Sequence, residues 1–460
     1  MLDKATIDCL ASIVGKDGVL ATRQDLVVYS YDGTFEEHQP DVVVLPRTIE
    51  QVSQLLVFAA TERIPVVTRG MGSGLAAASV PFRGGISLAM TRMNRLLEID
   101  EQNAIAHVEA GMVTADLQAA VEKRGLFYPP DPSSIRHSTI GGNIACNAGG
   151  PRCLKYGVTG DYVLGLTVVL ADGRVLHTGR KVIKDVVGYD MSALFTGSEG
   201  TLGVITEALL KLTAKPLFAR TALVEFVSLA DASRTVNAIL SSGTVPATLE
   251  LMDETAIACI EEAMHLGLPL DVEAILLVET DGSNEETVAR EIETVARISL
   301  ECGARQVKVA KDEAERASLW KARRSVSPSL ARKAPNKLGE DITVPRSAIP
   351  EAIRRLKAIS AEFGLPIVVF GHAGDGNLHP NILFDRRNTE QWAKIEPMVR
   401  KVFNLALDLG GTLSGEHGVG MLKRPYMMQA LGPASIEIQK RIKQVLDPFN
   451  ILNPGKVFPE

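Results

Sequence analysis

The chain has 460 residues, of which 46% are hydrophobic and 23% are charged, and its formal net charge is −6. This composition is typical of an ordinary soluble globular protein with two or about three domains, and the negative charge argues against a nucleic-acid-binding surface. The five cysteines are scattered and form no CxxC pair, so they predict free thiols and exclude both a zinc ribbon and a binding run for an iron–sulfur cluster.

The N-terminal segment carries acidic residues and no long apolar run, which argues against a secretory signal. No apolar run anywhere in the chain approaches the ~20 residues that span a bilayer. We therefore expect a cytoplasmic protein, and any association with a membrane would come through a partner subunit.

The first predicted unit is a strand–helix–strand. Residues 41–45 form an apolar run typical of a buried strand, and Thr48 and Gln51 have the spacing of a capping box. The strand predicted at 64–68 ends in a loop with glycines at alternate positions, 70, 72 and 74, which would let backbone N–H groups approach an anion. A dinucleotide fingerprint is excluded because Leu75 occupies the place of its third glycine.

The N-terminal half continues with strands predicted at 85–90 and 105–108 and a helix at 114–124 that ends at Gly125. A rigid Pro-rich turn then leads into the small, polar segment 138–150, which we expect to follow an extended path against a flat ligand; a mobile linker is the alternative. An Asp-Gly turn predicts a hairpin over 162–178, and a short helix, a glycine turn and a strand follow at 190–205.

From residue 222 the pattern changes to repeated strand–helix pairs. This alternation predicts an antiparallel sheet covered by helices on one face, as in a ferredoxin-like domain. Residues 319–324 are predicted to lie on a helix that carries Arg323, and Ser327 is expected to face the same way one turn later.

Two glycine-rich segments near the C-terminus carry histidines and a glutamate. His372 and His379 flank a tight turn between two predicted strands, and Glu416 and His417 stand side by side in the second segment. Two imidazoles and one carboxylate form a three-ligand set that leaves an open position on a metal, and His417 would then be a base beside it. The alternative is that these are ordinary histidines near turns.

Taken in this order, these segments resemble the vanillyl-alcohol-oxidase type of flavoprotein, in its D-2-hydroxyacid dehydrogenase branch. The resemblance covers nearly the whole chain and implies an α+β fold with an FAD-binding domain at 1–217, a ferredoxin-like cap with the substrate and metal site at 218–445, and a segment at 446–460 that returns to the flavin. Some relatives attach the flavin to a histidine of the first glycine loop. That position is Ser73 here, so non-covalent FAD is expected.

The resemblance also implies the residues that contact FAD. They surround the pyrophosphate, the flavin with its ribityl chain, and the adenine, and the last of them belongs to the C-terminal return segment: Arg69, Gly70, Gly72, Ser73, Gly74, Pro130, Asp131, Ser134, Thr139, Gly141, Gly142, Asn143, Ala145, Gly149, Glu199, Gly200, Ile205 and Asn453.

For the reaction, the resemblance implies that His372, His379 and Glu416 bind a divalent metal, with zinc as the first choice and manganese or iron as alternatives. His417 would be the catalytic base while a hydride leaves C2 of the substrate for flavin N5. Arg323 would bind the substrate carboxylate, with Ser327 and Asn381 in substrate reach. Lys337 is offset from the lysine that the hydroxyglutarate enzymes use, which favours a small monocarboxylate such as lactate or glycolate.

Several alternatives stay open at this stage. They are a D-2-hydroxyglutarate dehydrogenase, a transferase similar to alkyl-dihydroxyacetonephosphate synthase, a non-haem iron oxygenase, and an electron-transfer subunit without catalysis. The electron acceptor would be a separate iron–sulfur subunit, an electron-transferring flavoprotein, a cytochrome or a quinone, and the chain could form a homodimer or a hetero-complex.

Overall fold

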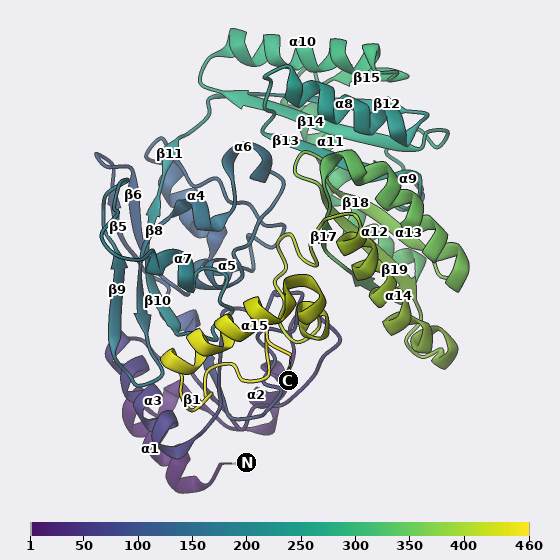
Figure 1. The fold of residues 1–460 in the computed structure, drawn as a ribbon. Helices are drawn as coiled ribbons and strands as arrows, with labels where there is room; N and C mark the ends of the chain where they lie inside the picture. Colours follow the sequence, from purple (N-terminus) through teal and green to yellow (C-terminus); the bar gives the residue numbers. More distant parts are fainter. Residues whose placement is uncertain (1, 460) are drawn as a thin grey trace. The chain divides into compact units, whose positions relative to one another are not determined.

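The computed structural model describes residues 2–459, which fold into two compact units (Figure 1). The second unit consists of Pro151–Tyr156 and Pro216–Gly415, and the first unit contains the rest of the described chain. The domain boundary expected at 217 lies close to this division. The return segment differs from the expectation, because the first unit takes up the chain again at Glu416 and not at 446.

In the first unit, one sheet has the strand order β1-β2-β4-β3, and β2, β4 and β3 are parallel. The helix α3 (Ile49–Glu62) connects β2 with β3. Thr48 begins this helix by accepting a hydrogen bond from the Gln51 N–H, while the Gln51 side chain accepts from Arg47 N–H, one residue earlier than in a regular capping box. The bounds of these strands and of the flanking helices are β1 (Val19–Leu20), β2 (Val42–Val44), β3 (Val66–Arg69), β4 (Ile86–Ala89), α1 (Lys4–Val14) and α2 (Arg23–Val28).

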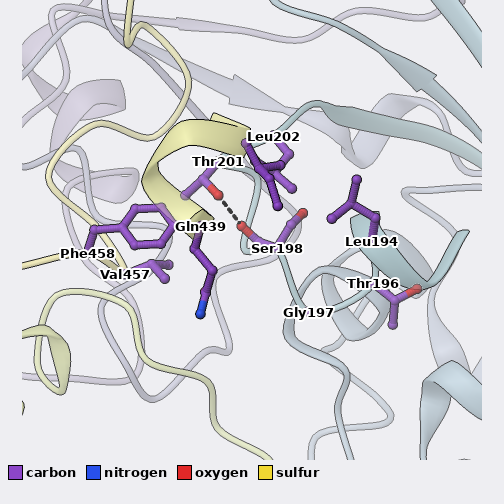
Figure 2. Close-up of a pocket in the computed structure, with 10 residues that line it drawn as sticks. Leu194, Thr196, Gly197, Ser198, Thr201, Leu202, Gln439, Val457 and Phe458 are labelled. Carbon is purple, nitrogen blue, oxygen red and sulfur yellow. Dashed lines mark hydrogen bonds between the residues drawn. The ribbon is translucent and has the colours of Figure 1, made fainter. Parts of the chain in front are cut away.

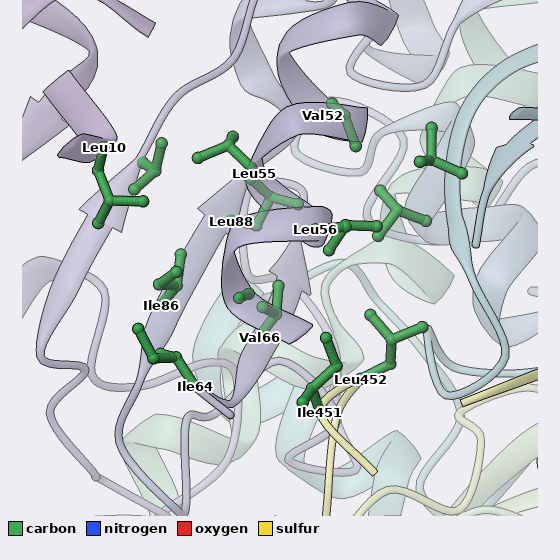
Figure 3. Close-up of a cluster of buried hydrophobic side chains, with 14 of the residues drawn as sticks. Leu10, Val52, Leu55, Leu56, Ile64, Val66, Ile86, Leu88, Ile451 and Leu452 are labelled. Atoms are coloured by element: carbon green, nitrogen blue, oxygen red, sulfur yellow. The ribbon is translucent and has the colours of Figure 1, made fainter. Parts of the chain in front are cut away.

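A hydrophobic core holds this sheet against α1 and α3 (Figure 3). Leu55 and Leu56 of α3 pack in it with strand residues such as Val66 and Ile86. The C-terminal segment joins the same core, since Val66 N–H donates to the carbonyl of Ile451 at 2.7 Å and Leu452 is fully buried. Ile451 and Leu452 are therefore part of the N-terminal fold.

The second sheet of the first unit has the order β5-β6-β10-β8-β9 with antiparallel pairing throughout. The predicted hairpin is confirmed, because β8 and β9 flank the Asp-Gly turn and Gly173 has a φ of 83°. The elements of this part are β5 (Leu96–Asp100), β6 (Ile105–Glu109), α4 (Thr114–Glu122), β7 (Leu126–Phe127), β8 (Val163–Val169), β9 (Val175–Gly179), α7 (Met191–Phe195), β10 (Val204–Lys211) and β11 (Thr213–Ala214).

The segment 138–150 corrects one expectation. We predicted an extended path, but residues Ile140–Cys146 form a short helix, α5. Thr139 caps it by accepting from Gly142 N–H, and Asn147 ends it in the left-handed conformation with a φ of 52°. Glycines at 141 and 142 disfavour a helix by propensity alone, so capping and the burial of Ile140 and Ile144 outweigh that cost.

The C-terminal helix α15 (Met427–Leu446) belongs to the first unit and bends at Gly432, whose backbone is not helical. Buried Lys443 of this helix donates to the carbonyls of Thr201 and Leu452, both at 2.8 Å, and forms an ion pair with Asp447. These bonds explain why the helix packs with the first unit, where we had expected it to be part of the cap.

In the second unit, the sheet has the order β15-β12-β14-β13-β18-β19-β16, and β17 also pairs with β19. Every pairing is antiparallel, as predicted. The strands are β12 (Phe218–Phe226), β13 (Thr248–Asp253), β14 (Ala274–Gly282), β15 (Gln306–Val309), β16 (Asn336–Gly339), β17 (Ile342–Thr343), β18 (Ile367–His372) and β19 (Asn377–Phe384).

Helices cover both faces of this sheet, so the one-face arrangement that we predicted is wrong. Glu279 of β14 binds Trp320 of α11, whereas its neighbour Thr280, which faces the other side, donates to the carbonyl of Val288 in α10. The physical reason is that the central strands are buried at nearly every position, which requires cover on both sides. The helices are α6 (Cys153–Tyr156), α8 (Leu229–Ser241), α9 (Glu254–Met264), α10 (Glu285–Glu301), α11 (Glu313–Arg324), α12 (Val326–Lys333), α13 (Ile349–Phe363) and α14 (Thr389–Asp408).

Two further expectations can be compared with the structure. The five cysteines all lie in the described part of the chain and are free thiols, as predicted. Among residues 2–459, no helix is both long enough and apolar enough to cross a bilayer.

Candidate functional site

The two histidines of the glycine-rich turn meet inside the second unit. His372 ends β18 and His379 lies in β19, so the predicted strand–turn–strand is confirmed. Both side chains are buried, their rings are nearly perpendicular with centroids 5.1 Å apart, and their Nε2 atoms are separated by 3.4 Å. Two imidazoles on one tetrahedral zinc ion would have their nitrogens roughly 3.3 Å apart, given Zn–N distances of about 2.0–2.1 Å. This pair therefore has the geometry of two ligands of one metal.

Each of these histidines directs its other ring nitrogen toward a buried carboxylate. Nδ1 of His372 lies 2.5 Å from Oε1 of Glu250, and Nδ1 of His379 lies 3.9 Å from Oδ1 of Asp341. Both acids are fully buried. The short contact with Glu250 holds the His372 ring and favours the tautomer in which Nε2 is the metal-binding nitrogen, whereas 3.9 Å is too long for a hydrogen bond from His379 to Asp341.

Glu250 also joins His372 to Arg323. The guanidinium of Arg323 donates through Nε to Oε2 of Glu250 at 2.6 Å and lies over the ring of Phe370, 4.9 Å from its centroid. Burial alone would raise the pKa of Glu250, but the charges of Arg323 and His372 lower that pKa to about 2. Arg323 is therefore held by one edge of its guanidinium in a buried, ionised pair.

The other predicted substrate residues lie in the same unit. Asn381 is buried in β19 and donates to the carbonyl of His379 at 2.9 Å. Ser327 lies in a separate helix, α12, because α11 ends at Arg324. There its hydroxyl accepts a hydrogen bond from Nζ of Lys337, whose pKa is lowered by burial.

Asp341 holds the chain just before the second glycine-rich segment. Its Oδ2 accepts from Ser414 Oγ at 2.7 Å and from Gly415 N–H at 3.0 Å, while its Oδ1 accepts from the Asn377 amide at 2.6 Å. Glu416 follows in sequence and opens the last stretch of the first unit.

Glu416 and His417 are half-buried in the first unit, with Nε2 of His417 3.9 Å from Oε1 of Glu416. Glu199 stabilises the residues that follow them, because its carboxylate oxygens accept from Val419 N–H at 2.6 Å and Gly420 N–H at 2.7 Å. The structure therefore places two of the predicted ligands in one unit and the third ligand and the base in the other.

In the first unit, the glycine loop after β3 wraps around Arg69. The guanidinium donates through Nη1 to the carbonyls of Tyr29 and Tyr31, and a Cβ on Gly72 would overlap it. Burial lowers the pKa of Arg69, and its buried Nε has no hydrogen-bond partner among the described residues. A Cβ on Gly70 would overlap the hydroxyl of Thr139, so this loop lies directly against the start of α5.

Further predicted cofactor residues lie near this loop or support it. The carbonyl of Pro130 accepts from the Gln118 amide at 2.9 Å, and a Cβ on Gly150 would lie 2.5 Å from the carbonyl oxygen of Asp131, which places Gly149 beside that turn. Asn143 donates its amide to Thr114 Oγ1 at 2.8 Å. Several side chains of the predicted cofactor set thus have protein partners in this structure, namely Arg69, Thr139, Asn143, Glu199 and Asn453.

Our sequence reasoning missed Glu250 and Asp341. Glu250 stands 122 positions from His372, so local spacing carried no information about their contact. One signal was available: Glu250 interrupts the apolar strand Thr248–Asp253 between two leucines, and a carboxylate at such a position is seldom buried without a partner.

The residues present fit both the divalent metal and the FAD cofactor that the resemblance implies. The buried imidazole pair with carboxylates at Nδ1 matches the donor chemistry of a divalent metal site. The glycine cradle that a Cβ would fill, together with the buried polar atoms Arg69 Nε and Asn453 Oδ1 that lack partners among the described residues, fits a polar cofactor.

Comparison with known proteins identifies the family. Residues 215–457 match the model of the C-terminal domain of FAD linked oxidases, and residues 40–179 match an FAD binding domain. The chain is 44% identical to the glycolate oxidase subunit GlcD of Bacillus subtilis over 459 residues, covering 100% of this chain and 97% of that protein. It is 34% identical to a D-lactate dehydrogenase of Anaerostipes hadrus over 443 residues, covering 95% and 92%.

Among solved structures, p-cresol methylhydroxylase with substrate bound superimposes with a TM-score of 0.84 at 18% identity, covering 99% of this chain and 96% of the other. This likeness shows the fold, which is of the vanillyl-alcohol-oxidase type as expected. The two matched domains and the 44% identical relative show that the chain belongs to the FAD-linked oxidases and is an FAD-linked oxidoreductase.

Proposed function

We propose that this protein oxidises a small D-2-hydroxyacid, glycolate or D-lactate, to the 2-oxoacid with non-covalently bound FAD. The observation that carries the proposal is the pair of buried imidazoles whose Nε2 atoms lie 3.4 Å apart while their Nδ1 atoms face Glu250 and Asp341. The names of the two relatives, a glycolate oxidase subunit and a D-lactate dehydrogenase, support the same substrate class.

In this proposal the first unit holds FAD and the second holds the substrate. His372 and His379 bind a divalent metal, zinc as the first choice, and Glu416 completes the ligand set. The metal, when bound, supplies a Lewis acid for the substrate hydroxyl. Support for Glu416 comes from its position in the chain, since Asp341 holds the preceding residue, Gly415, by its backbone N–H.

The side chains of the protein then have distinct roles. Arg323 pairs with the substrate carboxylate through the guanidinium edge that Glu250 leaves open. His417 accepts the proton of the 2-hydroxyl as the C2–H bond breaks. FAD, when bound, supplies the acceptor for the hydride from C2.

A second candidate substrate is D-2-hydroxyglutarate. The observation that favours it is Lys337, a partly buried lysine whose ammonium binds the hydroxyl of Ser327 in the same unit as Arg323. A second carboxylate on the substrate would give this cation an anionic partner. Lys337→Ala would then raise KM for hydroxyglutarate and leave KM for lactate unchanged.

We also propose that the reduced flavin passes its electrons to a separate acceptor, because the chain has no run of cysteines that could bind an iron–sulfur cluster. The B. subtilis relative is named as a subunit of an oxidase, which supports a hetero-complex. Anaerobically reduced protein should be reoxidised faster by its acceptor than by dioxygen.

The substrate class is tested by anaerobic titration of the purified, FAD-loaded protein with D- and L-2-hydroxyacids, followed by flavin bleaching. We expect reduction by glycolate or D-lactate and none by L-lactate. A flavin that stays oxidised with every 2-hydroxyacid, hydroxyglutarate included, would refute the proposal.

The base and the metal are tested separately. His417→Ala should retain FAD and abolish turnover, whereas His265→Asn, a change at an exposed histidine of the same chain, should behave as wild type. Chelation should lower activity while the flavin spectrum persists, and metal analysis should find less metal in His372→Ala and His379→Ala. A fully active preparation without metal would refute the ligand assignment.

A further inference from the structure

Glu199 has an unusual conformation and a fully used side chain. It is 6% exposed, has a φ of 52°, and directs both carboxylate oxygens to backbone N–H groups, Oε1 to Val419 and Oε2 to Gly420. Its own N–H donates to the carbonyl of Ala145 at 2.8 Å. A buried carboxylate that receives two N–H bonds holds two backbone positions at once.

The loop that Glu199 holds, residues 416–420, is closed on its other side by the C-terminal segment. Val457 N–H donates to the carbonyl of Gly420 at 2.9 Å, and the Asn453 amide donates to the carbonyls of Glu199 at 2.7 Å and Ala78 at 2.9 Å. Lys456 adds a hydrogen bond from Nζ to the carbonyl of Val80 at 2.7 Å. Three distant parts of the chain therefore converge on this loop.

Backbone strain concentrates at the same place. Positive φ values occur at Ala77 (58°), Glu199 (52°), Asn453 (43°) and Val457 (64°), and for a β-branched residue such as Val457 this conformation is a genuine outlier. Strain of this kind persists only where the surrounding contacts enforce it, and it collects at functional sites. The loop itself tolerates only glycine at 420, because a Cβ there would overlap the carbonyl of Ala76.

We infer that Glu199 is a positioning residue that fixes the loop 416–420 and thereby orients His417. This inference rests on the proposed function only for the role of His417 as the base. It gives Glu199 a different role from the contact with the adenine of FAD that the resemblance implies. An amide at this position has a single acceptor oxygen, so Glu199→Gln keeps the shape of the side chain but leaves one of the two N–H groups facing an NH₂.

The control is Ser198→Ala. Ser198 neighbours Glu199 in sequence and lines a pocket of about 220 Å³ with Gln439, Val457 and Phe458 (Figure 2). Ser198 is half-buried, and the N–H groups of Val419 and Gly420 bind Glu199 and not Ser198, so its truncation should leave the loop 416–420 unchanged.

The first measurement is hydrogen–deuterium exchange of the FAD-loaded protein, which does not depend on turnover. In Glu199→Gln, peptides that contain Val419 and Gly420 should exchange roughly tenfold faster, whereas peptides from β18 and β19 should match those of wild type and Ser198→Ala. Unchanged exchange at 419–420 would overturn the inference, even if wild-type flavin were reduced by no 2-hydroxyacid.

The second measurement separates positioning from cofactor binding. If Glu199 positions His417, the FAD content and KM of Glu199→Gln should stay near wild type, while the rate of flavin reduction at saturating substrate falls roughly 10- to 100-fold. Loss of FAD from the variant, with normal reduction in the fraction that remains loaded, would favour the adenine contact and overturn the inference.

Discussion

Glu250 and His372 form a buried carboxylate–imidazole pair, with Oε1 and Nδ1 separated by 2.5 Å. The same carboxylate holds Arg323, so one acid orients both the proposed metal ligand and the proposed substrate ligand. Its removal should therefore affect two functions at once.

Glu250→Gln should lower metal affinity roughly 10- to 100-fold, because His372 loses the partner that fixes its tautomer. It should also reduce the free energy of unfolding by about 3–5 kcal/mol, because the buried charge of Arg323 loses its partner. Metal analysis and urea unfolding measure the two effects. Glu225→Gln is the matched control, since Arg305 keeps a second carboxylate partner in Asp271; equal metal loss in both variants would contradict the role of Glu250.

Gly371→Ala should displace the two histidines. A Cβ on Gly371 would overlap the carbonyl oxygen of Asn377 and approach Cα of Leu378 to 2.9 Å, which would push β18 and β19 apart. We expect a loss of about 1–3 kcal/mol in the free energy of unfolding and a lower metal content. Gly364→Ala is the control, because its added Cβ would meet no other part of the protein within 4 Å and the only strain is an alanine with a φ of 65°. This variant should lose stability but keep its metal.

Stability should depend on pH through Asp253. Burial raises the pKa of this acid to about 7 in the folded protein, above the value near 3.9 of an unfolded chain. Between these values the folded protein binds a proton that the unfolded chain has released, so the free energy of unfolding should decrease as pH rises from about 4 to about 7. Over that window the contribution is roughly 4 kcal/mol.

Asp253→Asn should flatten that pH dependence. Asparagine still caps α9, where Asp253 accepts from Ala256 N–H at 2.8 Å, but it does not ionise. Urea unfolding at pH 5, 6, 7 and 8 gives the slopes of both proteins. A wild-type slope in the variant would assign the dependence to other groups.

Gly70→Ala should weaken FAD binding. The added Cβ would overlap Oγ1 of Thr139 and lie 3.1 Å from its Cγ2, which would separate the glycine loop from the start of α5. The flavin-to-protein ratio from absorbance spectra measures the effect. Gly188→Ala is the control, because an added Cβ there would meet no other part of the protein within 4 Å, and this variant should retain wild-type flavin. Full flavin occupancy in both variants would contradict the role of the contact between Gly70 and Thr139.

Local patterns in the sequence were sufficient for much of the fold. The apolar runs around His372 and His379 predicted both strands and their turn, and the Asp172-Gly173 pair predicted a hairpin, because such signals depend on neighbouring residues. The pattern failed for α5, where a cap and two buried isoleucines outweigh a glycine-rich sequence. The prediction of helices on one face of the cap sheet also failed. The sequence pattern of a helix does not indicate which face of the sheet that helix covers.

The site was harder to predict because its supporting contacts are long-range. Glu250 meets His372, and Asp341 meets Gly415, only after the sheet of the second unit has formed. Glu199 is a similar case, since 220 positions separate it from Val419. Spacing in a single sequence carries no record of such pairs, and an acid placed in an apolar strand is the strongest hint available.

The division of the chain between Gly415 and Glu416 also limits how this enzyme can be re-engineered. Chimeras that exchange the cap between relatives need a junction where the chain leaves the second unit, and that point adjoins Glu416. A cut at this point leaves Asp341 with Ser414 and Gly415 in the cap, and it leaves Glu199 with Val419 and Gly420 in the first unit. A crossover placed further along, within α15, would take the loop 416–420 from the donor of the cap. The C-terminal segment that contacts this loop through Val457 would then come from the other parent.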